Sequence, residues 1–433
     1  MEYYAHEETW DRERIERTQI VRLKNTLAQA MRSPFYKGHL DAAGIRPEKI
    51  NSLDDLKRIP FTAKEHMRAA YPYGLVAVPR EELVRFHASS GTTGSPVVVC
   101  HTQDDLDTWA DLMARCMHMV GIRKGDVFQN IAGYGLFTGG LGIHSGAERL
   151  GCLTIPAGTG NTRRQIKLLR DMRVKALHII PSYALYLGKA VQDEGEDPRS
   201  LPPTIALVGA EPHTAEARGR IEDLLGLKAY NSYGLSEMNG PGVAFECTEQ
   251  NGLHVWEDAY IAEIVDPESG EALPDGELGE LVMTTLSRRG MPVIRFRTRD
   301  LTRFLPGDCP CGRKHRRLDR IAGRVDDMFI IKGCNIYPMQ VEQILMSFRE
   351  VGENYLIILE NEDNMDRMRV QVEIRGEYFV EDMRVLTSLQ RRIASRLHDE
   401  ILITPKVELA QPNAVPRSEG KARRVEDRRA ARA

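Results

Sequence analysis

The stretch Thr204-Ile205-Ala206-Leu207-Val208-Gly209-Ala210-Glu211-Pro212 joins an apolar run to a polar turn that contains a glycine. Its first five residues are β-branched or aliphatic, and this composition predicts a buried strand that ends at Gly209. A helical pattern follows from Thr214 to Leu225, and Leu227 to Tyr230 predicts the next strand. A strand, a helix and a second strand in this order form the repeating unit of a parallel sheet.

The same alternation extends upstream, with strands predicted at 126–131, 152–156 and 176–180 and helices between them. Repeated strand–helix alternation is typical of a doubly wound α/β fold. In such folds ligands bind beyond the carboxyl ends of the strands. Polar segments stand at three of these ends: Pro181-Ser182-Tyr183, Gly209-Ala210-Glu211-Pro212 and Asn231-Ser232-Tyr233-Gly234-Leu235-Ser236-Glu237. Their convergence predicts a ligand site at this edge of the sheet.

A hydroxyl-rich loop, Ser89-Ser90-Gly91-Thr92-Thr93-Gly94-Ser95-Pro96, lies between two short apolar runs. Glycines let main-chain N–H groups approach an anion closely, and the hydroxyls add uncharged donors. The loop therefore predicts a phosphate site. It is not a Walker loop, because no Gly-Lys-Ser/Thr ends it. The alternative is a flexible Ser/Gly/Thr turn.

A second glycine-rich loop, 132–142, contains Tyr134 and Phe137. Glycines here let the backbone lie close to a ligand, and the aromatic rings would give that ligand an apolar wall. The competing interpretation is a glycine-rich helix start packed tightly against a sheet. The two interpretations carry equal weight before context.

Beyond residue 240 the pattern changes to turns and short strands, one of them at 291–295. From about Asp326 a separate β-α-β-β-α-β order, with its first strand at 328–331, suggests a ferredoxin-like module. We therefore predict an α/β protein with a large N-terminal domain (1–325), built of doubly wound sheets plus a β subdomain at about 240–325. A small, mobile α+β C-terminal domain is expected at 326–433.

The bulk composition is that of an ordinary globular protein, with 42% hydrophobic and 28% charged residues among 433. The net charge of −3 gives no electrostatic case for nucleic acid or an anionic membrane. No apolar run is long enough to span a bilayer, and the polar, acidic N-terminus lacks the features of a signal peptide. We expect a cytoplasmic protein without nucleic-acid or membrane partners.

Three of the seven cysteines fall in the β subdomain together with one histidine, in two groups: Cys247 with His254, and Cys309 with Cys311. Three cysteines and one histidine form a closed tetrahedral set of the kind that holds structural Zn²⁺. His315 is a competing nitrogen ligand. The alternative is unrelated buried thiols and a surface histidine.

Six motifs in order resemble those of the adenylate-forming superfamily, which includes acyl-CoA synthetases, adenylation domains and luciferases. They are Ser89–Gly94, Gly209–Pro212, Tyr233–Glu237, Arg297-Thr298-Arg299-Asp300, Gly323-Arg324-Val325-Asp326-Asp327 and Pro416-Arg417-Ser418-Glu419-Gly420-Lys421. Three details resemble the phenylacetate–CoA ligase branch in particular. They are Val97 after Ser95-Pro96, Asn335 in the hinge region, and the final motif.

This resemblance implies that ATP activates an aryl or arylacetic acid, phenylacetate first, to an acyl-adenylate, and that coenzyme A then takes the acyl group. Lys421, Glu237 and Thr92 would act in catalysis, with Glu237 holding Mg²⁺. The hinge would be Asp326. The nucleotide and coenzyme A would be bound by Ser89, Ser90, Gly91, Thr93, Gly94, Gly209, Ala210, Glu211, Pro212, Asn231, Ser232, Tyr233, Gly234, Asp300, Arg324, Gly333, Asn335 and Tyr337. Among them, the resemblance implies that Asp300 accepts hydrogen bonds from the ribose hydroxyls and that the adenine site is lined by Glu211, Pro212, Asn231, Ser232 and Tyr233.

The acid pocket is expected to be apolar and lined by Tyr134, Gly135, Phe137, Gly139, Ile180 and Pro181. No basic residue stands in the loop 134–141 to pair with a second carboxylate, which favours a monocarboxylic acid.

Several alternatives stay open. They are a ligase for benzoate or an indole acid, adenylyl transfer to another acceptor as in coenzyme F390 synthetases, a non-catalytic nucleotide-binding protein, and a zinc-dependent nucleic-acid binder, which the net charge opposes. A homodimer is one state that the resemblance allows.

Overall fold

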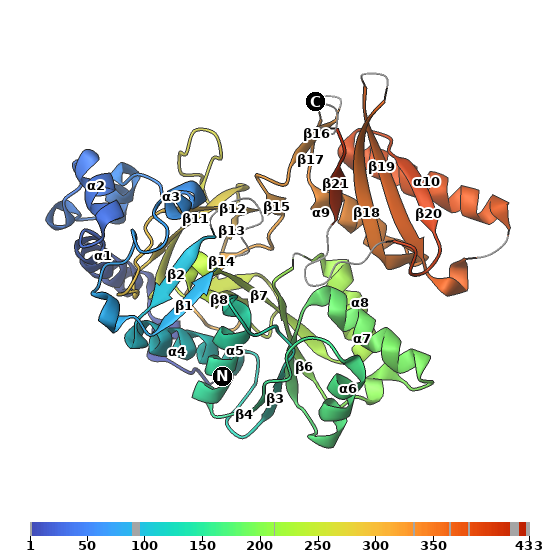
Figure 1. Cartoon of the computed structure of the whole chain (residues 1–433), viewed down its shortest axis with the longest axis horizontal. Helices are drawn as coiled ribbons and strands as arrows, with labels where there is room; N and C mark the ends of the chain where they lie inside the picture. The colour runs from blue at the N-terminus through green and yellow to red at the C-terminus, as the bar shows by residue number, and fades with distance from the viewer. Residues whose placement is uncertain are drawn as a thin grey trace. The chain divides into compact units, whose positions relative to one another are not determined.

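The computed structural model describes residues 2–88, 96–211, 213–331, 334–362, 365–379, 382–415 and 424–429, with the side chains of Asn335 and Met365 left out. The chain divides into two compact units (Figure 1). The first consists of Met1–Ile179, Arg199–Ala210 and Gly226–Ile321, and the second of Ile180–Pro198, Glu211–Leu225 and Ala322–Ala433.

A nine-stranded mixed sheet forms the centre of the first unit, in the order β13-β14-β9-β8-β7-β6-β5-β3-β4. The strands from β4 to β7 run parallel, and those from β7 to β13 are antiparallel. The predicted α/β class is confirmed. The strand bounds are β3 Val127–Asn130, β4 Leu153–Ile155, β5 Ala176–Ile179, β6 Ile205–Gly209, β7 Lys228–Leu235, β8 Gly240–Glu246, β9 Leu253–Val255, β13 Phe304–Leu305 and β14 Arg317–Leu318.

Two further sheets belong to this unit. The hairpin β1 (Arg85–Ala88) and β2 (Val98–His101) flanks the hydroxyl-rich loop, and β10 (Tyr260–Val265), β11 (Gly279–Thr285) and β12 (Phe296–Thr302) follow in antiparallel order. A strand predicted at 291–295 is wrong, because β12 begins only at Phe296. Arg295 has φ +43°, which is outside the extended region, and its guanidinium forms a buried ion pair with Glu263.

Helices of the first unit begin where the sequence offers caps. Thr102 accepts the backbone N–H of Asp105 and starts α4 (Gln103–Met119), while Gly151, at φ +89°, ends α5 (Thr138–Leu150). The apolar faces of these helices join the main core around Phe128 and Phe245. The other helices are α1 Arg12–Ala30, α2 Pro34–Ala42, α3 Lys64–Ala69 and α6 Thr162–Asp171, with short 3₁₀ turns at His6–Thr9, Pro47–Lys49, Leu53–Arg58, Arg80–Glu82 and Ser236–Met238 (η6).

The second unit is built on a four-stranded sheet in the order β20-β19-β18-β21. Its core surrounds Tyr355 and Ile393. The strand predicted at 328–331 does not join this sheet: it pairs with β17, and β21 takes a place next to β18. The bounds are α7 Pro181–Asp193, α8 Ala215–Leu225, β15 Gly323–Arg324, β16 Phe329–Ile331, β17 Cys334–Ile336, α9 Pro338–Ser347, β18 Val351–Glu362, β19 Met365–Ile374, α10 Met383–Ile401, β20 Lys406–Ala410 and β21 Val425–Asp427.

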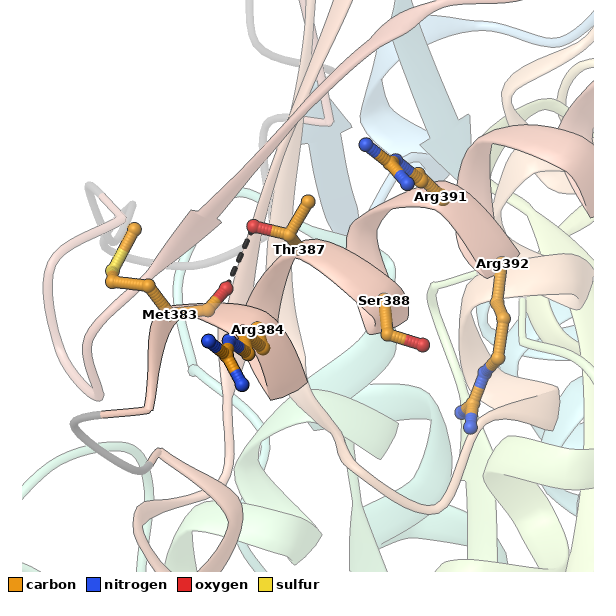
Figure 2. A pocket seen from close by; sticks show the side chains of 6 residues that line it. All are labelled: Met383, Arg384, Thr387, Ser388, Arg391 and Arg392. Atoms are coloured by element: carbon orange, nitrogen blue, oxygen red, sulfur yellow. Dashed lines mark hydrogen bonds between the residues drawn. The ribbon is translucent and has the colours of Figure 1, made fainter.

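A hollow runs along the exposed start of α10 (Figure 2). None of the predicted site residues lines it. The lining is Met383, Arg384, Thr387, Ser388, Arg391 and Arg392. Among the described helices, none combines the length and the apolar composition that crossing a bilayer requires.

Candidate nucleotide site and cysteine cluster

The carboxyl ends of β6 and β7 lie side by side, with Gly209 opposite Ser232. A side chain at Gly209 would place its Cβ 2.6 Å from the carbonyl oxygen of Ser232, so this close approach requires glycine. Ala210 follows in the left-handed region at φ +66°. Asn231, Ser232, Tyr233 and Gly234 all lie on β7. The structure thus brings these predicted residues of the first unit to one edge of the sheet.

Tyr233 links this edge to β12. Its hydroxyl donates a hydrogen bond to Oδ2 of Asp300 at 2.6 Å, and both side chains are buried. The backbone N–H of Asp300 is held by Thr298. Two motifs separated by more than sixty positions therefore meet through one hydrogen bond to a carboxylate.

Glu246 is a residue of this edge that the sequence motifs missed. Its carboxylate is 1% exposed, accepts the backbone N–H of Asn231 at 2.8 Å, and pairs with Arg320 at 3.3 Å. These contacts hold the predicted adenine segment in place. Because Glu246 stands on the antiparallel neighbour β8, no local spacing marks it.

Glu237 lies in η6, directly after β7, and is buried. The preceding Ser236 shares a hydrogen bond with Thr138 at 3.2 Å, and the carbonyl oxygen of Glu237 accepts Nη1 of Arg288 at 2.6 Å. The carboxylate itself has no hydrogen bond or ion pair to the residues that the structure describes. A buried carboxylate without a partner among the described residues fits an oxygen-preferring cation such as Mg²⁺.

The glycine-rich loop at 132–138 is joined to the strand that precedes the hydroxyl-rich loop. Leu136 accepts the N–H of Ala88 at 2.9 Å and contacts Nδ1 of His87 at 3.1 Å. Within the loop, the Tyr134 hydroxyl meets Asn130 and His144, and burial raises the pKa of Tyr134.

Four of the predicted acid-pocket residues lie in this loop or at the start of α5: Tyr134, Gly135, Phe137 and Gly139. The Phe137 side chain is exposed.

Other predicted residues belong to the second unit. Ile180 caps α7 and Pro181 is its first, buried residue. Glu211 accepts both the backbone N–H and the hydroxyl of Ser182, at 3.2 and 3.0 Å. The sequence marks Ser182 only as part of a polar strand end, and the structure pairs it with the carboxylate of Glu211.

Near the predicted hinge, Arg324 forms an ion pair with Asp326 at 2.9 Å, and both groups are accessible to solvent. Tyr337 caps α9, and its ring lies 3.2 Å from the position that a Cβ on Gly323 would take. Arg324, Asp326 and Tyr337 are thus neighbours along one segment of this unit.

Several predicted residues lie outside the described part of the chain. They are Ser89, Ser90, Gly91, Thr92, Thr93, Gly94, Pro212, Gly333 and Lys421, together with the side chain of Asn335.

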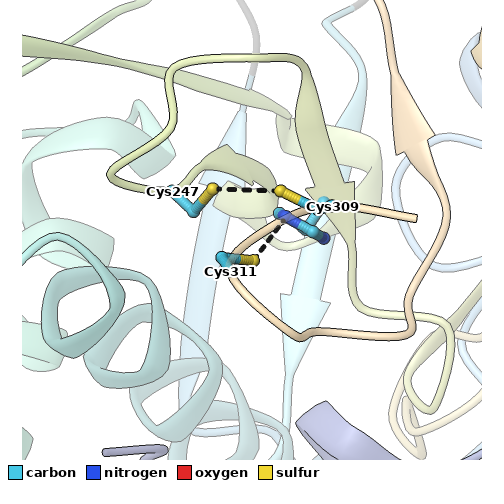
Figure 3. A group of neighbouring side chains, drawn as sticks. Cys247, Cys309 and Cys311 are labelled. Atoms are coloured by element: carbon cyan, nitrogen blue, oxygen red, sulfur yellow. Dashed lines mark hydrogen bonds between the residues drawn. The ribbon is translucent and has the colours of Figure 1, made fainter. Parts of the chain in front are cut away.

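The four predicted zinc ligands gather in one buried cluster of the first unit (Figure 3). The ligand atoms of Cys247, His254, Cys309 and Cys311 lie within 4.8 Å of one another. The Cys247 and Cys309 sulfurs are 3.7 Å apart, and Cys311 Sγ is 3.4 Å from Nε2 of His254. This compact set of three sulfurs and one nitrogen is the donor set of a tetrahedral zinc site.

The surroundings of the cluster decide which histidine belongs to it. Nδ1 of His254 lies 3.2 Å from the carbonyl oxygen of His315, an arrangement that orients Nε2 toward the sulfurs. Both ring nitrogens of His315 are used elsewhere, by the N–H of Glu257 and the carbonyl of Glu7. His254, not the competing His315, is therefore the nitrogen donor.

The N-terminal segment covers this cluster. The Tyr3 hydroxyl donates to the carbonyl oxygen of Cys311 at 3.2 Å, and Glu8 forms a buried ion pair with Arg313 at 2.6 Å. Nothing in the sequence pattern of this segment indicated the contact. A metal in the cluster would thus tie residues 3–8 to the β part of the unit.

Two family models and several known proteins match this chain over most of its length. The AMP-binding enzyme family model matches residues 36–287, and the AMP-binding enzyme C-terminal domain model matches residues 333–429. The chain is 45% identical to phenylacetate-coenzyme A ligase of Thermus thermophilus, over 99% of this chain and 100% of that protein. It is 46% identical to phenylacetate-coenzyme A ligase of Pseudomonas putida, over 95% and 94%.

A solved structure of 2-hydroxyisobutyryl-CoA ligase, in the postadenylation state in complex with 2-HIB-AMP, is similar with a TM-score of 0.92 and 31% identity, covering 98% of this chain and 92% of that one. A coenzyme A ligase of the adenylate-forming kind uses ATP, coenzyme A and an acid. The family-model matches and the near full-length identities agree with the order of motifs along the chain. The chain therefore belongs to the adenylate-forming superfamily of AMP-binding enzymes, in its phenylacetate–coenzyme A ligase branch.

Proposed function

We propose that this chain is an AMP-forming acid–thiol ligase that converts an aryl or arylacetic acid, phenylacetate first, to its coenzyme A thioester. The observation that carries this proposal is the 45–46% identity to two phenylacetate–CoA ligases over nearly the whole chain. The contact between Tyr233 and Asp300 supports it, because a carboxylate suited to the ribose hydroxyls would lie against β7, the strand that directly precedes Glu237.

The chemistry has two steps. A carboxylate oxygen of the acid attacks the α-phosphorus of ATP, and pyrophosphate leaves with the bonding electrons. The thiolate of coenzyme A then attacks the acyl carbonyl carbon, and AMP leaves. Both steps need fixed donors and cations where charge develops on phosphoryl and carbonyl oxygens.

The protein's own groups have distinct tasks in this proposal. Asp300, oriented by Tyr233, accepts hydrogen bonds from the ribose hydroxyls. The backbone at Gly209–Ala210, on the edge of the sheet, borders the adenine. Glu237 is the residue that would hold Mg²⁺, which supplies charge neutralisation on the phosphate oxygens. Lys421 supplies the cation between the acid and the α-phosphate, and rotation about Asp326 exchanges it for the segment around Tyr337 in the thioester step.

An acid-dependent ATP–pyrophosphate exchange assay tests the proposal. Phenylacetate, benzoate and indole acids are compared with and without coenzyme A. Exchange with phenylacetate that needs no coenzyme A, followed by thioester formation when it is added, is the expected result. Exchange without any thioester would favour the coenzyme F390 synthetase type of adenylyl transfer, and absence of exchange with every aromatic acid would overturn the proposal.

Lys421→Ala separates the two half-reactions. Adenylate formation should be lost, while attack of coenzyme A on supplied acyl-adenylate should continue at close to the normal rate. Equal loss of both half-reactions would contradict the role given to Lys421.

We propose a second, structural function for the cysteine cluster: it holds Zn²⁺. The supporting observation is the donor set of Cys247, His254, Cys309 and Cys311, whose ligand atoms lie within 4.8 Å of one another in a buried place. Metal analysis of protein purified without chelator should find zinc in proportion to protein. Protein without zinc, and with unchanged stability after zinc is added, would remove this assignment.

A further inference from the structure

Arg288 is a buried cation beside the predicted magnesium ligand. It lies between β11 and β12 and is 3% exposed. Nη1 donates to the carbonyl oxygen of Glu237 at 2.6 Å, whereas Nε and Nη2 have no hydrogen-bond partner among the described residues. Burial lowers the pKa of Arg288. Across the described ranges no carboxylate forms an ion pair with this guanidinium.

The carboxylate that acts on Arg288 electrostatically is already engaged. Asp105 accepts the backbone N–H groups of Thr102, Arg289 and Gly290 at 2.9, 2.6 and 2.9 Å. These bonds fix the loop that carries Arg288. Among the described residues, however, no carboxylate contacts the Arg288 guanidinium directly. A buried charge that is not fully compensated costs folding free energy, so a use for it is expected elsewhere.

The histidines on the neighbouring hairpin add little positive charge next to Arg288. His87 on β1 and His101 on β2 both have a pKa that burial lowers, and both ring nitrogens of His101 lack a partner. Both imidazoles are therefore mostly neutral near pH 7 and do not compete with Arg288 as cations.

The peptide of Glu237 is held from two sides. Thr138 contacts the hydroxyl of Ser236, and Arg288 holds the carbonyl of Glu237 itself. We propose that Arg288 is a positioning residue, which fixes this peptide so that the Glu237 carboxylate is oriented to bind the magnesium ion of the nucleotide. This inference rests on the proposed function, because it takes the nucleotide to be bound as its magnesium complex. Partners that orient a metal ligand from outside the coordination sphere commonly matter nearly as much as the ligand.

The test compares R288M with R288K and with R289M as the matched control. Arg289 is the next residue and also carries a positive charge, but its side chain is half-exposed and pairs with Glu82 and Asp104. Magnesium–ATP binding is measured by calorimetry without any acid, followed by the magnesium dependence of the exchange rate and the melting temperature.

R288M should bind magnesium–ATP about 10- to 100-fold more weakly, the range found when an outer partner of a metal ligand is removed. R288K should lie between R288M and the wild type, because an ammonium keeps the charge but has a shorter reach. R289M should bind as the wild type does. The exchange rate of R288M should need more magnesium for half saturation.

Wild-type affinity and magnesium dependence in R288M would overturn the inference, as would equal losses in R289M. If R288M does not fold, R288K decides: a purely structural role predicts wild-type affinity in the folded variant. The binding data need no acid, so they separate the two proposals. A wild type that binds magnesium–ATP but exchanges with no aromatic acid refutes the proposed substrate class alone, and one that does not bind it refutes both.

Discussion

The substitution Gly234→Ala tests how closely β7 and β8 must approach beside the nucleotide edge. The register between these strands shifts at Tyr233 and Gly234, where a bulge brings Gly240 close. A Cβ on Gly234 would lie 2.0 Å from the carbonyl oxygen of Gly240 and 2.7 Å from Cα of Pro241. Real Cβ contacts essentially never fall below 3.0 Å, so backbone atoms must move by about 1 Å.

Two measurable effects follow. Overpacking of this kind costs about 1–3 kcal/mol of folding free energy. Tyr233 and Glu237 stand within three residues of Gly234, so a backbone displacement of about 1 Å there would also slow the exchange reaction by about 100-fold. Urea denaturation and acid-dependent ATP–pyrophosphate exchange measure the two effects.

Gly38→Ala is the matched control. It adds the same methyl group inside α2, where nothing lies within 4 Å, and should stabilise the protein by about 0.5–1 kcal/mol. Gly234→Ala with the wild-type unfolding midpoint and exchange rate would refute the reasoning, because it would mean that the strands separate without consequence for the site.

Tyr233→Phe removes the hydroxyl that donates to Asp300. The KM for ATP in the exchange assay should rise about 10-fold, since hydrogen bonds to charged groups contribute about 1.5–3 kcal/mol. An unchanged KM would contradict the proposal that Tyr233 orients Asp300 for ATP binding. Cys311→Ser should lose bound zinc and lower the melting temperature, and full zinc content by elemental analysis would contradict the ligand set. Burial lowers the pKa of His178 to about 4, so below pH 6.5 the unfolded chain binds a proton that the folded chain does not, and stability falls as the pH falls. Between pH 7 and pH 5, the free energy of unfolding of His178→Leu, measured by urea titration, should therefore fall by about 2 kcal/mol less than that of the wild type. Equal falls would show that another group dominates the pH dependence of stability. Arg220 donates hydrogen bonds to three backbone carbonyls around the end of α9, at 2.7 to 3.0 Å. Arg220→Ala should therefore speed amide hydrogen exchange in α9 but not in α1. Unchanged exchange in α9 would mean that these bonds contribute little to its local stability.

Local patterns were sufficient to predict the parallel strands and the residues at their carboxyl ends. Strand–helix alternation depends on side-chain periodicity within a few residues, which the sequence contains directly. The strand at 176–180 and the polar end at 231–237 illustrate this. The first strand of the C-terminal module lies where the sequence predicts it, but strand order alone did not specify pairing: β16 pairs with its neighbour β17, and β21, from far along the chain, lies next to β18.

Residues whose importance depends on another segment escaped sequence analysis. Arg288 and Arg289 are adjacent arginines in a loop, and no pattern distinguishes the buried one from the half-exposed one. Glu246 occupies a strand position like any other, yet it holds the backbone of Asn231 from the neighbouring strand. Burial and partner choice are properties of the packed chain, so composition and spacing do not specify them.

The sequence by itself determined the α/β class, the order of the site motifs and the residue types able to act on a nucleotide, because these follow from short-range periodicity and from the chemistry of each side chain. Only the tertiary structure decided which of two histidines joins Cys247, Cys309 and Cys311. It selects His254, since the ring nitrogens of His315 are already engaged by backbone groups from other segments. Such choices depend on side-chain directions set by contacts across more than fifty positions of the chain.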